Sequence, residues 1–384
     1  MCVSTQANMK GAPVRVLVSG GGTAGHIYPA LTVAELVSAD ARDRVAYVGA
    51  PNSLEQRLAG ERGVEFVSVP ARGWDRARPV TLLTGFATAA VSTVRCVHLL
   101  RRDRTDAVAG FGGYVSVPLS LAAVICRVPL VLHEQNSVPG VANRILARFA
   151  RSVCVTYEDS VPLLPHPGRA VVTGDPVRES VLRADRDAGR EALGIAPDET
   201  LLLVFGGSRG ARHVNGALLA LRERLEDVDC LRVVQIAGPL EAADVRAALE
   251  AHSGGIPAWW QVLEYVAEMG DLLAAADLVV CRAGATTLAE ISVLGKASVL
   301  VPYPYATDDH QTLNAGPFLR AGASLVVADA DLDGPALWEA LAKLLADPAA
   351  RAAMASAAAS LGRPDAARAV VRALTAAAER REVA

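Results

Sequence analysis

The feature that most constrains this chain is an apolar, strand-like run that ends in glycines and is followed at once by a helical pattern. Residues 14–19 have the sequence VRVLVS, and residues 20–26 have the sequence GGGTAGH. A glycine-rich turn between a strand and the first turn of a helix lets backbone N–H groups approach a phosphate closely. The same order recurs at residues 201–212, LLLVFGGSRGAR. Two such starts predict two Rossmann-like domains in tandem.

The first turn also has the G-x-G-x-x-G spacing of dinucleotide sites, through Gly20, Gly22 and Gly25. A dinucleotide site needs an acidic residue about 20 positions on, at the end of the second strand, to bind a ribose. The second predicted strand, residues 45–48, is instead followed by GAPN. Because no carboxylate stands there, we expect the turn to bind a diphosphate that does not belong to NAD.

Strand-like runs alternate with helical stretches along the chain, which favours α/β domains with parallel sheets. Strands are expected at residues 14–19, 45–48, 64–69, 106–109, 130–132, 153–155, 170–172, 201–205, 232–236, 261–263, 278–280, 298–301 and 324–327. Ala-rich helices are expected at residues 334–346 and 350–381. The sequence TGDP at residues 173–176 predicts a boundary between domains of residues 1–174 and 175–362, and residues 363–384 are expected to pack back on the first domain.

The composition and charge of the chain argue against several classes of protein. The six cysteines are scattered, without a C-x-x-C pair or a histidine at ligand spacing, so we expect neither a metal site nor a disulfide. No apolar run is long enough to span a bilayer and no secretory signal pattern is present, which predicts a cytoplasmic, soluble or peripheral protein. Residues 1–174 carry 18 Lys and Arg against 12 Asp and Glu, and the remainder carries 20 against 29. A basic first half suits an anionic membrane or substrate, and its excess is too small to indicate nucleic acid.

Residues 281–290, CRAGATTLAE, follow a predicted strand, where ligands of parallel α/β domains bind. Gly284 begins a helix with Thr286 and Thr287 in its first turn, and Glu290 shares their face one turn on. A carboxylate there is placed to accept both hydroxyls of a ribose whose diphosphate lies at the helix start. This pattern is typical of nucleotide-sugar binding, and helix capping is the alternative interpretation.

Three further strand ends carry polar or small residues: FGGY at residues 111–114, HEQN at 133–136 and a segment with DDHQ at 308–311. Four polar side chains directly after an apolar strand are costly unless they are exposed or used in a site. Asp, His, Gln and Asn side chains are typical of sugar-hydroxyl recognition. The alternatives are a solvated loop for His310 and a helix cap for Glu134. The adjacent acids at 308–309 do not form a D-x-D motif, so no metal is assigned.

Taken in order, these motifs resemble the MurG family of UDP-N-acetylglucosamine (UDP-GlcNAc) transferases. The resemblance covers about residues 14–327 and rests on residues 21–26, 112–116, 133–136, 206–208, 284–290 and 310–315. It implies the GT-B fold, in which two Rossmann-like domains with parallel sheets face a central cleft. It also implies an inverting transfer of GlcNAc to the 4-hydroxyl of the N-acetylmuramoyl group of lipid I, an undecaprenyl-diphosphate-linked pentapeptide, which gives lipid II for peptidoglycan synthesis.

The resemblance assigns the donor UDP-GlcNAc mainly to the second domain and lipid I to the first. The expected donor-binding residues are Thr23, Ala24, Gly25, Asn136, Arg178, Ser208, Gly284, Thr287, Glu290 and Gln311. The expected acceptor-binding residues are Gly20, Gly21, Gly22, Tyr114, His133 and Gln135. Glu290 would hold the ribose, Ser208 the diphosphate and Gln311 the sugar. The chain departs from the family's pattern at Asp175, where Asn is usual, and at Arg209, while Thr286 stands where the family varies.

An inverting displacement needs a base for the acceptor hydroxyl and stabilisation of the departing UDP. His26 is the expected base, because the positive end of its helix keeps the imidazole neutral; a phosphate-donor role is the alternative. Glu134 is the rival base. Helix N-termini at Ser208 and Gly284 can stabilise UDP without a metal, so no cofactor is expected.

A lipid-linked acceptor requires the first domain to contact the bilayer. Residues 72–86 combine arginines with apolar side chains, which is typical of an interfacial patch, although a core helix with a solvated lead-in is the alternative. The expected patch consists of Trp74, Arg76, Arg78, Leu82, Leu83 and Phe86. The expected location is therefore peripheral, on the cytoplasmic side of the cell membrane. Expected partners are the anionic inner leaflet and other cell-wall synthesis proteins, without nucleic acid.

Three other functions share parts of these motifs: a non-hydrolysing UDP-GlcNAc epimerase, a GT-B transferase for another lipid or natural-product acceptor, and a non-catalytic nucleotide-sugar sensor. The sequences at residues 20–26 and 133–136 favour a lipid-diphosphate acceptor over all three.

Overall fold

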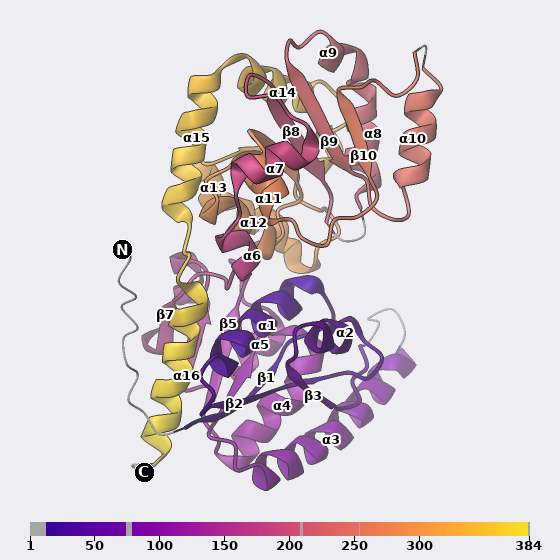
Figure 1. Cartoon of the computed structure of the whole chain (residues 1–384). Helices are drawn as coiled ribbons and strands as arrows, with labels where there is room; N and C mark the ends of the chain where they lie inside the picture. Colours follow the sequence, from indigo (N-terminus) through magenta and orange to yellow (C-terminus); the bar gives the residue numbers. More distant parts are fainter. Residues whose placement is uncertain (1–12, 74–78, 208–209, 253, 383–384) are drawn as a thin grey trace.

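The computed structural model describes residues 13–73, 79–207, 210–252 and 254–382, which form two α/β domains (Figure 1). The first domain has a parallel sheet in the order β3-β2-β1-β4-β5-β6-β7, and the second has one in the order β10-β9-β8-β11-β12-β13. In both, the chain starts in the middle of the sheet and reverses its direction of growth once, which is the doubly wound Rossmann arrangement. The prediction of two Rossmann-like domains is confirmed.

The predicted strands are all present, to within two residues at each end. The first sheet contains β1 (Arg15–Ser19), β2 (Arg44–Gly49), β3 (Glu65–Ser68), β4 (Ala107–Gly110), β5 (Leu130–Glu134), β6 (Ser152–Val155) and β7 (Ala170–Val172). The second contains β8 (Thr200–Phe205), β9 (Leu231–Ile236), β10 (Trp260–Leu263), β11 (Leu278–Cys281), β12 (Ala297–Leu300) and β13 (Leu325–Val326). The inner strands are buried on both faces, as in Val18 of β1, which pairs with Tyr47 and Ala109. Such strands are nearly continuous apolar runs, which is why the sequence shows them clearly.

Helices cover both faces of each sheet. The helices of the first half are α1 (Ala24–Ser38), α2 (Leu54–Glu61), α3 (Pro79–Arg102), α4 (Gly113–Cys126) and α5 (Val141–Leu146), with 3-10 turns η1 (Glu158–Leu163) and η2 (Pro167–Arg169). Those of the second are α6 (Glu179–Leu182), α7 (Arg186–Leu193), α8 (Arg212–Ala220), α9 (Arg222–Glu226), α10 (Ala242–Glu250), α11 (Gly270–Ala275), α12 (Ala285–Val293), α13 (His310–Arg320) and α14 (Ala336–Ala346), with η3 (Thr307–Asp309) and η4 (Asp329–Asp331). In the first domain, α3, α4 and α5 pack on one face of the sheet, and α1 packs on the other.

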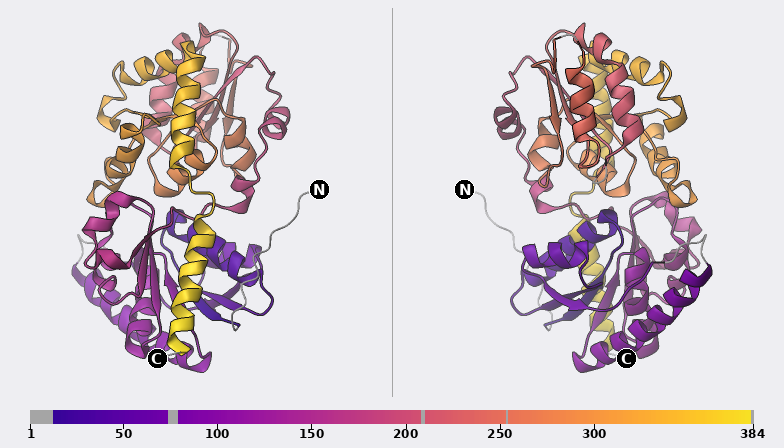
Figure 2. Two further views of the ribbon diagram at one scale, coloured as in Figure 1. Left: turned by 90° about the vertical axis from the view of Figure 1, so that its left-hand side faces the viewer. Right: turned by 90° about the vertical axis from the view of Figure 1, so that its right-hand side faces the viewer.

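The Ala-rich C-terminal region is two helices, α15 (Pro348–Leu361) and α16 (Ala366–Glu382), so the expectation of one helix over residues 350–381 is wrong. Gly362 leaves the helical conformation with ψ 139°, and Pro364 lacks the N–H that a continuous helix would need. The break lets α15 pack on α12 and β12 of the second domain while α16 packs on α1 and across β4 to β6 of the first. Figure 2, left, shows this side of the molecule face on.

The loops that follow the strands of one domain meet those of the other. Thr286 Oγ1 at the start of α12 donates to the carbonyl oxygen of Gly25 in α1, at 3.4 Å. The side chain of Asn314 in α13 accepts a hydrogen bond from the backbone N–H of Ser137, at 2.8 Å. The carboxyl ends of both sheets therefore face one junction, which is where the residues predicted to form the site lie.

Candidate functional site

The first glycine-rich turn is packed so closely that side chains are excluded. A Cβ on Gly20 would lie 2.6 Å from the carbonyl oxygen of His26, and Gly22 has a φ of +86°. The turn also lies against the start of α4, where a Cβ on Gly113 would come 2.0 Å from the carbonyl oxygen of Gly21. Thr23, the N-cap of α1, makes no side-chain capping bond. The first N–H groups of α1 therefore keep the positive end of the helix open to an anion.

His26, in the first turn of α1, is oriented by its neighbours. Its Nδ1 is 2.9 Å from Thr23 Oγ1, and the opposite edge of the ring lies against Gly112, where a Cβ would be 3.2 Å from Nε2. Burial, and then the charge of His310 in α13, lower the pKa of His26 to about 4. The ring is therefore neutral near pH 7. In the tautomer that donates Nδ1–H to Thr23 Oγ1, Nε2 carries the lone pair that a base needs.

Glu134, at the end of β5, is buried and its carboxylate is fully engaged. Oε1 accepts from the backbone N–H of Asn136 at 3.1 Å and from its Nδ2 at 3.2 Å. Oε2 accepts from the N–H of Gly140 at 3.1 Å and from Asn143 Nδ2 at 2.8 Å. Burial raises the pKa of Glu134, and these four donors oppose the rise. Glu134 thus organises the loop after β5, and Asn143, which the sequence analysis did not single out, assists it.

Three residues predicted to contact the acceptor lie in different settings. Gln135 Nε2 donates to the carbonyl oxygen of Phe111 at 2.8 Å, and His133 Nε2 lies 2.9 Å from that of Gly174. Both side chains are buried, and in each of them one nitrogen bonds the protein's own backbone while His133 Nδ1 and Gln135 Oε1 have no partner among the described residues. Tyr114 is partly exposed and its ring covers Gly22. Acceptor contact by these residues stays a prediction, and the structure places Tyr114 best for it.

The second helix N-terminus belongs to α12. Its N-cap, Gly284, makes no side-chain capping bond, and Thr287 lies in the first turn beside it. Glu290, on the next turn, is buried and accepts two hydrogen bonds on Oε1 from Arg178, at 3.1 Å from Nε and 2.8 Å from Nη2. Oε2 takes no hydrogen bond from the described part of the chain. Burial raises the pKa of Glu290, and the charge of Arg178 opposes this.

Arg178 itself is fixed across the two domains. Its guanidinium carbon lies 4.5 Å from the centre of the Tyr28 ring in α1, a cation–π contact that the sequence analysis did not anticipate. Arg178 therefore links the hinge, α1 and the carboxylate of Glu290.

The remaining donor residues lie around this junction. Gln311, in α13, accepts a hydrogen bond from the backbone N–H of Tyr303 at 2.9 Å through Oε1, which leaves its amide N–H groups for a ligand. Gly210 packs so closely on the end of β9 that a Cβ would be 2.3 Å from the carbonyl oxygen of Ala237. Ser208 and Arg209 lie outside the described residues, as do Trp74, Arg76 and Arg78 of the expected membrane patch. Leu82 and Leu83 lie on α3, and their side chains are also outside the description.

Asn314 joins the two domains directly, a role that its place four residues after His310 did not reveal. Besides accepting from Ser137, it donates through Nδ2 to Asn136 Oδ1 at 3.1 Å and to the carbonyl oxygen of Ala283 at 3.4 Å, and it is fully buried. It therefore ties the loop after β5 to the start of α12.

Replacing Asn314 with alanine is expected to lower the free energy of unfolding by about 1–3 kcal/mol, because Ser137 and Asn136 lose a buried partner. Donor affinity is expected to fall with it, since Asn136 is no longer held. Urea unfolding and titration with UDP-GlcNAc measure both. The control is Thr312→Ala, on the same helix, whose hydroxyl donates to the exposed Asp309. Equal losses in both variants would contradict a linking role for Asn314.

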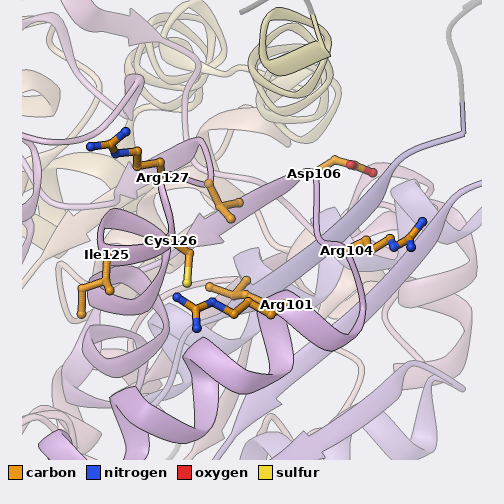
Figure 3. Close-up of a pocket in the computed structure, with 8 residues that line it drawn as sticks. Arg101, Arg104, Asp106, Ile125, Cys126 and Arg127 are labelled. Atoms are coloured by element: carbon orange, nitrogen blue, oxygen red, sulfur yellow. The ribbon is translucent and has the colours of Figure 1, made fainter.

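A groove of about 520 Å³ lies elsewhere, at the amino ends of β4 and β5. It is lined by Leu100, Arg101, Arg104, Asp106, Ile125, Cys126, Arg127 and Val128. Figure 3 shows Arg104 and Arg127 on opposite sides of it. Because the predicted site residues lie at the carboxyl ends of the strands, this groove is not part of the site.

Comparisons with known proteins agree with this geometry. Residues 16–155 match the Glycosyltransferase family 28 N-terminal domain, and residues 201–370 match the family 28 C-terminal domain. The UDP-N-acetylglucosamine–N-acetylmuramyl-(pentapeptide) pyrophosphoryl-undecaprenol N-acetylglucosamine transferase of Desulfitobacterium hafniense (strain Y51) is 41% identical over 92% of this chain and 96% of its own length.

Among solved structures, MurG of Acinetobacter baumannii is 29% identical, with a TM-score of 0.74 over 94% of this chain and 99% of its own. The UDP-GlcNAc 2-epimerase of Neisseria meningitidis has a TM-score of 0.68 over 94% of this chain and 99% of its own, at 14% identity. At that identity the epimerase shares the fold alone.

Proposed function

The chain belongs to the MurG family, within glycosyltransferase family 28, and from this premise we propose how its residues divide the transfer of GlcNAc between them. The protein is an N-acetylglucosaminyltransferase that converts lipid I into lipid II with UDP-GlcNAc as donor. The observation that carries the proposed division is that His26 lies in the first turn of α1, next to Gly25, whose carbonyl oxygen bonds Thr286 at the start of α12. Both helices have N-caps without a side-chain capping bond, and they meet at the junction of the domains.

The second domain binds the donor in this proposal. Glu290 accepts the ribose hydroxyls through Oε2, because Arg178 already occupies Oε1. The N-terminus of α12 and the turn after β8 receive the diphosphate, and their N–H groups stabilise the negative charge on departing UDP. Gln311 and Asn136 bind the sugar through their amide groups. No cofactor is required, since helix dipoles and Arg178 supply the positive potential.

The first domain binds the acceptor diphosphate at the N-terminus of α1, with Tyr114 closing the turn. His26 Nε2 takes the proton from the 4-hydroxyl while that oxygen attacks the anomeric carbon from the face opposite UDP, which inverts the configuration. Glu134 is a positioning residue, because its four hydrogen bonds fix the loop that carries Asn136.

The direct test is transfer of radiolabelled GlcNAc from UDP-GlcNAc to a lipid I analogue, with UDP release followed in parallel. We expect labelled lipid II and UDP in equal amounts, and transfer that persists in EDTA. The control is an acceptor that lacks the diphosphate, to which the same enzyme should transfer little GlcNAc. Formation of UDP-N-acetylmannosamine without release of UDP would instead support the epimerase, and binding without turnover would support the sensor.

We also propose that the layer formed by α3, α4 and α5 is the surface that meets the membrane. The structure describes no helix long and apolar enough to cross a bilayer. These three adjacent helices contain no Asp or Glu, and they expose large apolar side chains, of which Phe86 is 65%, Ile125 61% and Phe149, just after α5, 58% exposed. Arg95, Arg144 and Arg148 lie exposed on the same layer. Apolar groups among arginines suit the anionic cytoplasmic leaflet.

The combined substitution of Phe86, Ile125 and Phe149 with serine is expected to abolish flotation with anionic vesicles, because each exposed side chain contributes buried apolar area on binding. Thermal stability should change little, since these side chains contact water in the free protein. The control replaces Leu240 and Leu319, exposed in the second domain, with serine. Unchanged flotation of the triple variant, or equal loss in the control, would contradict the assignment.

A further inference from the structure

Asp175 presents an unusual feature, a buried carboxyl group without a well-formed hydrogen bond. It lies in the hinge after β7, is 2% exposed, and neither of its oxygens has a partner among the described residues. The nearest counterpart is Nδ1 of His133 in β5, 3.9 Å from Oδ1, which also lacks a partner. Two unsatisfied buried polar atoms that face each other need an explanation, because each costs free energy when left unpaired.

The groups around Asp175 offer it no positive charge. From β5 it faces His133 and Glu134, and from α12 it faces Thr286 and Glu290. Tyr157, after β6, completes the surroundings.

Two arginines lie near the hinge, and the first, Arg178, is already paired with Glu290. Arg363 packs its aliphatic carbons on Gly174 and makes no hydrogen bond to Asp175. An ionised Asp175 would therefore stand beside two other carboxyl groups. Burial, followed by the charges of Glu290 and Glu134, raises the pKa of Asp175 well above its usual range, and the Thr286 hydroxyl opposes this.

The contact of His133 Nε2, on the other side of the ring, determines which protons His133 and Asp175 carry. His133 Nε2 is 2.9 Å from the carbonyl oxygen of Gly174, and a carbonyl only accepts, so Nε2 carries a hydrogen. Burial lowers the pKa of His133 to about 4, so the ring is neutral and Nδ1 has a lone pair. A hydrogen on the carboxyl group of Asp175 can face that lone pair. At 3.9 Å this contact is too long for a hydrogen bond, so the proton stays on Asp175 and neither side chain is charged.

The Thr286 hydroxyl of α12 donates to the Gly25 carbonyl of α1 and lies near Asp175, so the carboxyl group of Asp175 is placed at the contact between the domains. We propose that Asp175 is a positioning residue that holds the two domains closed only while its carboxyl group keeps its proton. When that proton is lost, an unbalanced charge lies between β5 and α12, and the closed arrangement that forms the donor site becomes less favourable. This rests on the proposed function in one respect, that UDP-GlcNAc binds at the junction.

The direction of the pH dependence follows from linkage. When the domains open and water reaches the carboxyl group, its pKa returns toward about 3.9. A carboxyl group whose pKa is raised in the closed form favours closure fully when the pH is below its open-form pKa. This contribution is lost as the pH rises from the open-form pKa to the closed-form pKa. Affinity for UDP-GlcNAc should therefore fall with rising pH, by up to about tenfold per pH unit within that window. Asp175→Asn, which cannot ionise, should show no such fall.

The experiment compares wild type, Asp175→Asn and the control Asp198→Asn, an exposed aspartate in the second domain. UDP-GlcNAc affinity and thermal unfolding are measured from about pH 5 to about pH 9, a range over which neither the sugar nucleotide's diphosphate nor the asparagine titrates. We expect wild type and Asp198→Asn to lose affinity and stability together as pH rises, while Asp175→Asn keeps both. Infrared spectra should contain a protonated-carboxyl band that Asp175→Asn lacks.

Parallel pH profiles for wild type and Asp175→Asn, or an infrared spectrum without the band, would overturn the proposal. The failure of the proposed function gives a different result: UDP-GlcNAc would bind none of the three proteins at any pH, while the stability profiles and the infrared band still report on the proton.

Discussion

Alanine in place of His26 is expected to lower kcat for GlcNAc transfer by about 100- to 10,000-fold, the usual contribution of a positioned general base. The Kd for UDP-GlcNAc is expected to change little, because the donor's nucleotide is held by Glu290 and Arg178 in the other domain. The reason lies in the ring's setting: Thr23 fixes Nδ1, and the closeness of Gly112 orients Nε2. Single-turnover kinetics with a lipid I analogue separate the chemical step from binding.

His26→Gln is the matched variant, since its amide can still bond Thr23 but cannot accept a proton. It should be about as slow as the alanine variant; restored turnover would mean that His26 acts through hydrogen bonding alone. The pH dependence gives a second check. Because the pKa of His26 is lowered to about 4, its neutral form persists above that value and is lost only as pH falls through it. The His26-dependent part of kcat should be constant from about pH 6 upward.

Glu290→Gln is expected to weaken UDP-GlcNAc binding by about 10- to 100-fold, the range for loss of a buried charged hydrogen bond. Glutamine fills the same space, but it accepts on one atom only, so it cannot hold Arg178 and also accept from both ribose hydroxyls. It also leaves the buried charge of Arg178 without its counter-ion, which is costly. Isothermal titration with UDP-GlcNAc measures the loss.

A 2′-deoxy analogue of UDP-GlcNAc identifies the group that Glu290 binds. Wild type should bind the analogue more weakly than UDP-GlcNAc, while Glu290→Gln should bind the two almost equally, because the interaction is already missing. Glu339→Gln, exposed on α14 of the same domain, is the control and should behave as wild type. Additive losses in Glu290→Gln would show that Glu290 does not contact the 2′-hydroxyl of the ribose.

The chain's order of strands and helices could be predicted because both sheets are parallel. A strand buried on both faces needs an unbroken apolar run, and a parallel connection needs a helix after it, so each element leaves a local signal. A boundary after residue 362 was expected but the end of the helix there was not, because alanine favours helix on both sides of Gly362 and only packing on two separate domains requires the helix to stop.

The sequence alone determined that two glycine-rich turns and a strand-end motif with Glu290 would lie at the edges of two sheets, since a period of alternating strands and helices fixes which residues follow a strand. Tertiary structure decided how those edges combine. Asn314 bonds a loop far away in the sequence, Arg178 lies on the Tyr28 ring, and Glu134 uses all four of its hydrogen bonds for its own loop. Such pairings depend on how two domains meet, and no local pattern records them.

The protonation states of His26 and Asp175 also depend on the tertiary structure. His26 is at a helix N-terminus by sequence, but it is kept neutral by burial and by the charge of His310, which belongs to the second domain. Asp175 is only a polar residue beside a proline in the sequence; its isolation from any cation, and its place opposite His133, arise when β5, the hinge and α12 pack together. A carboxyl group's charge depends on its solvent and neighbours, and folding alone sets both.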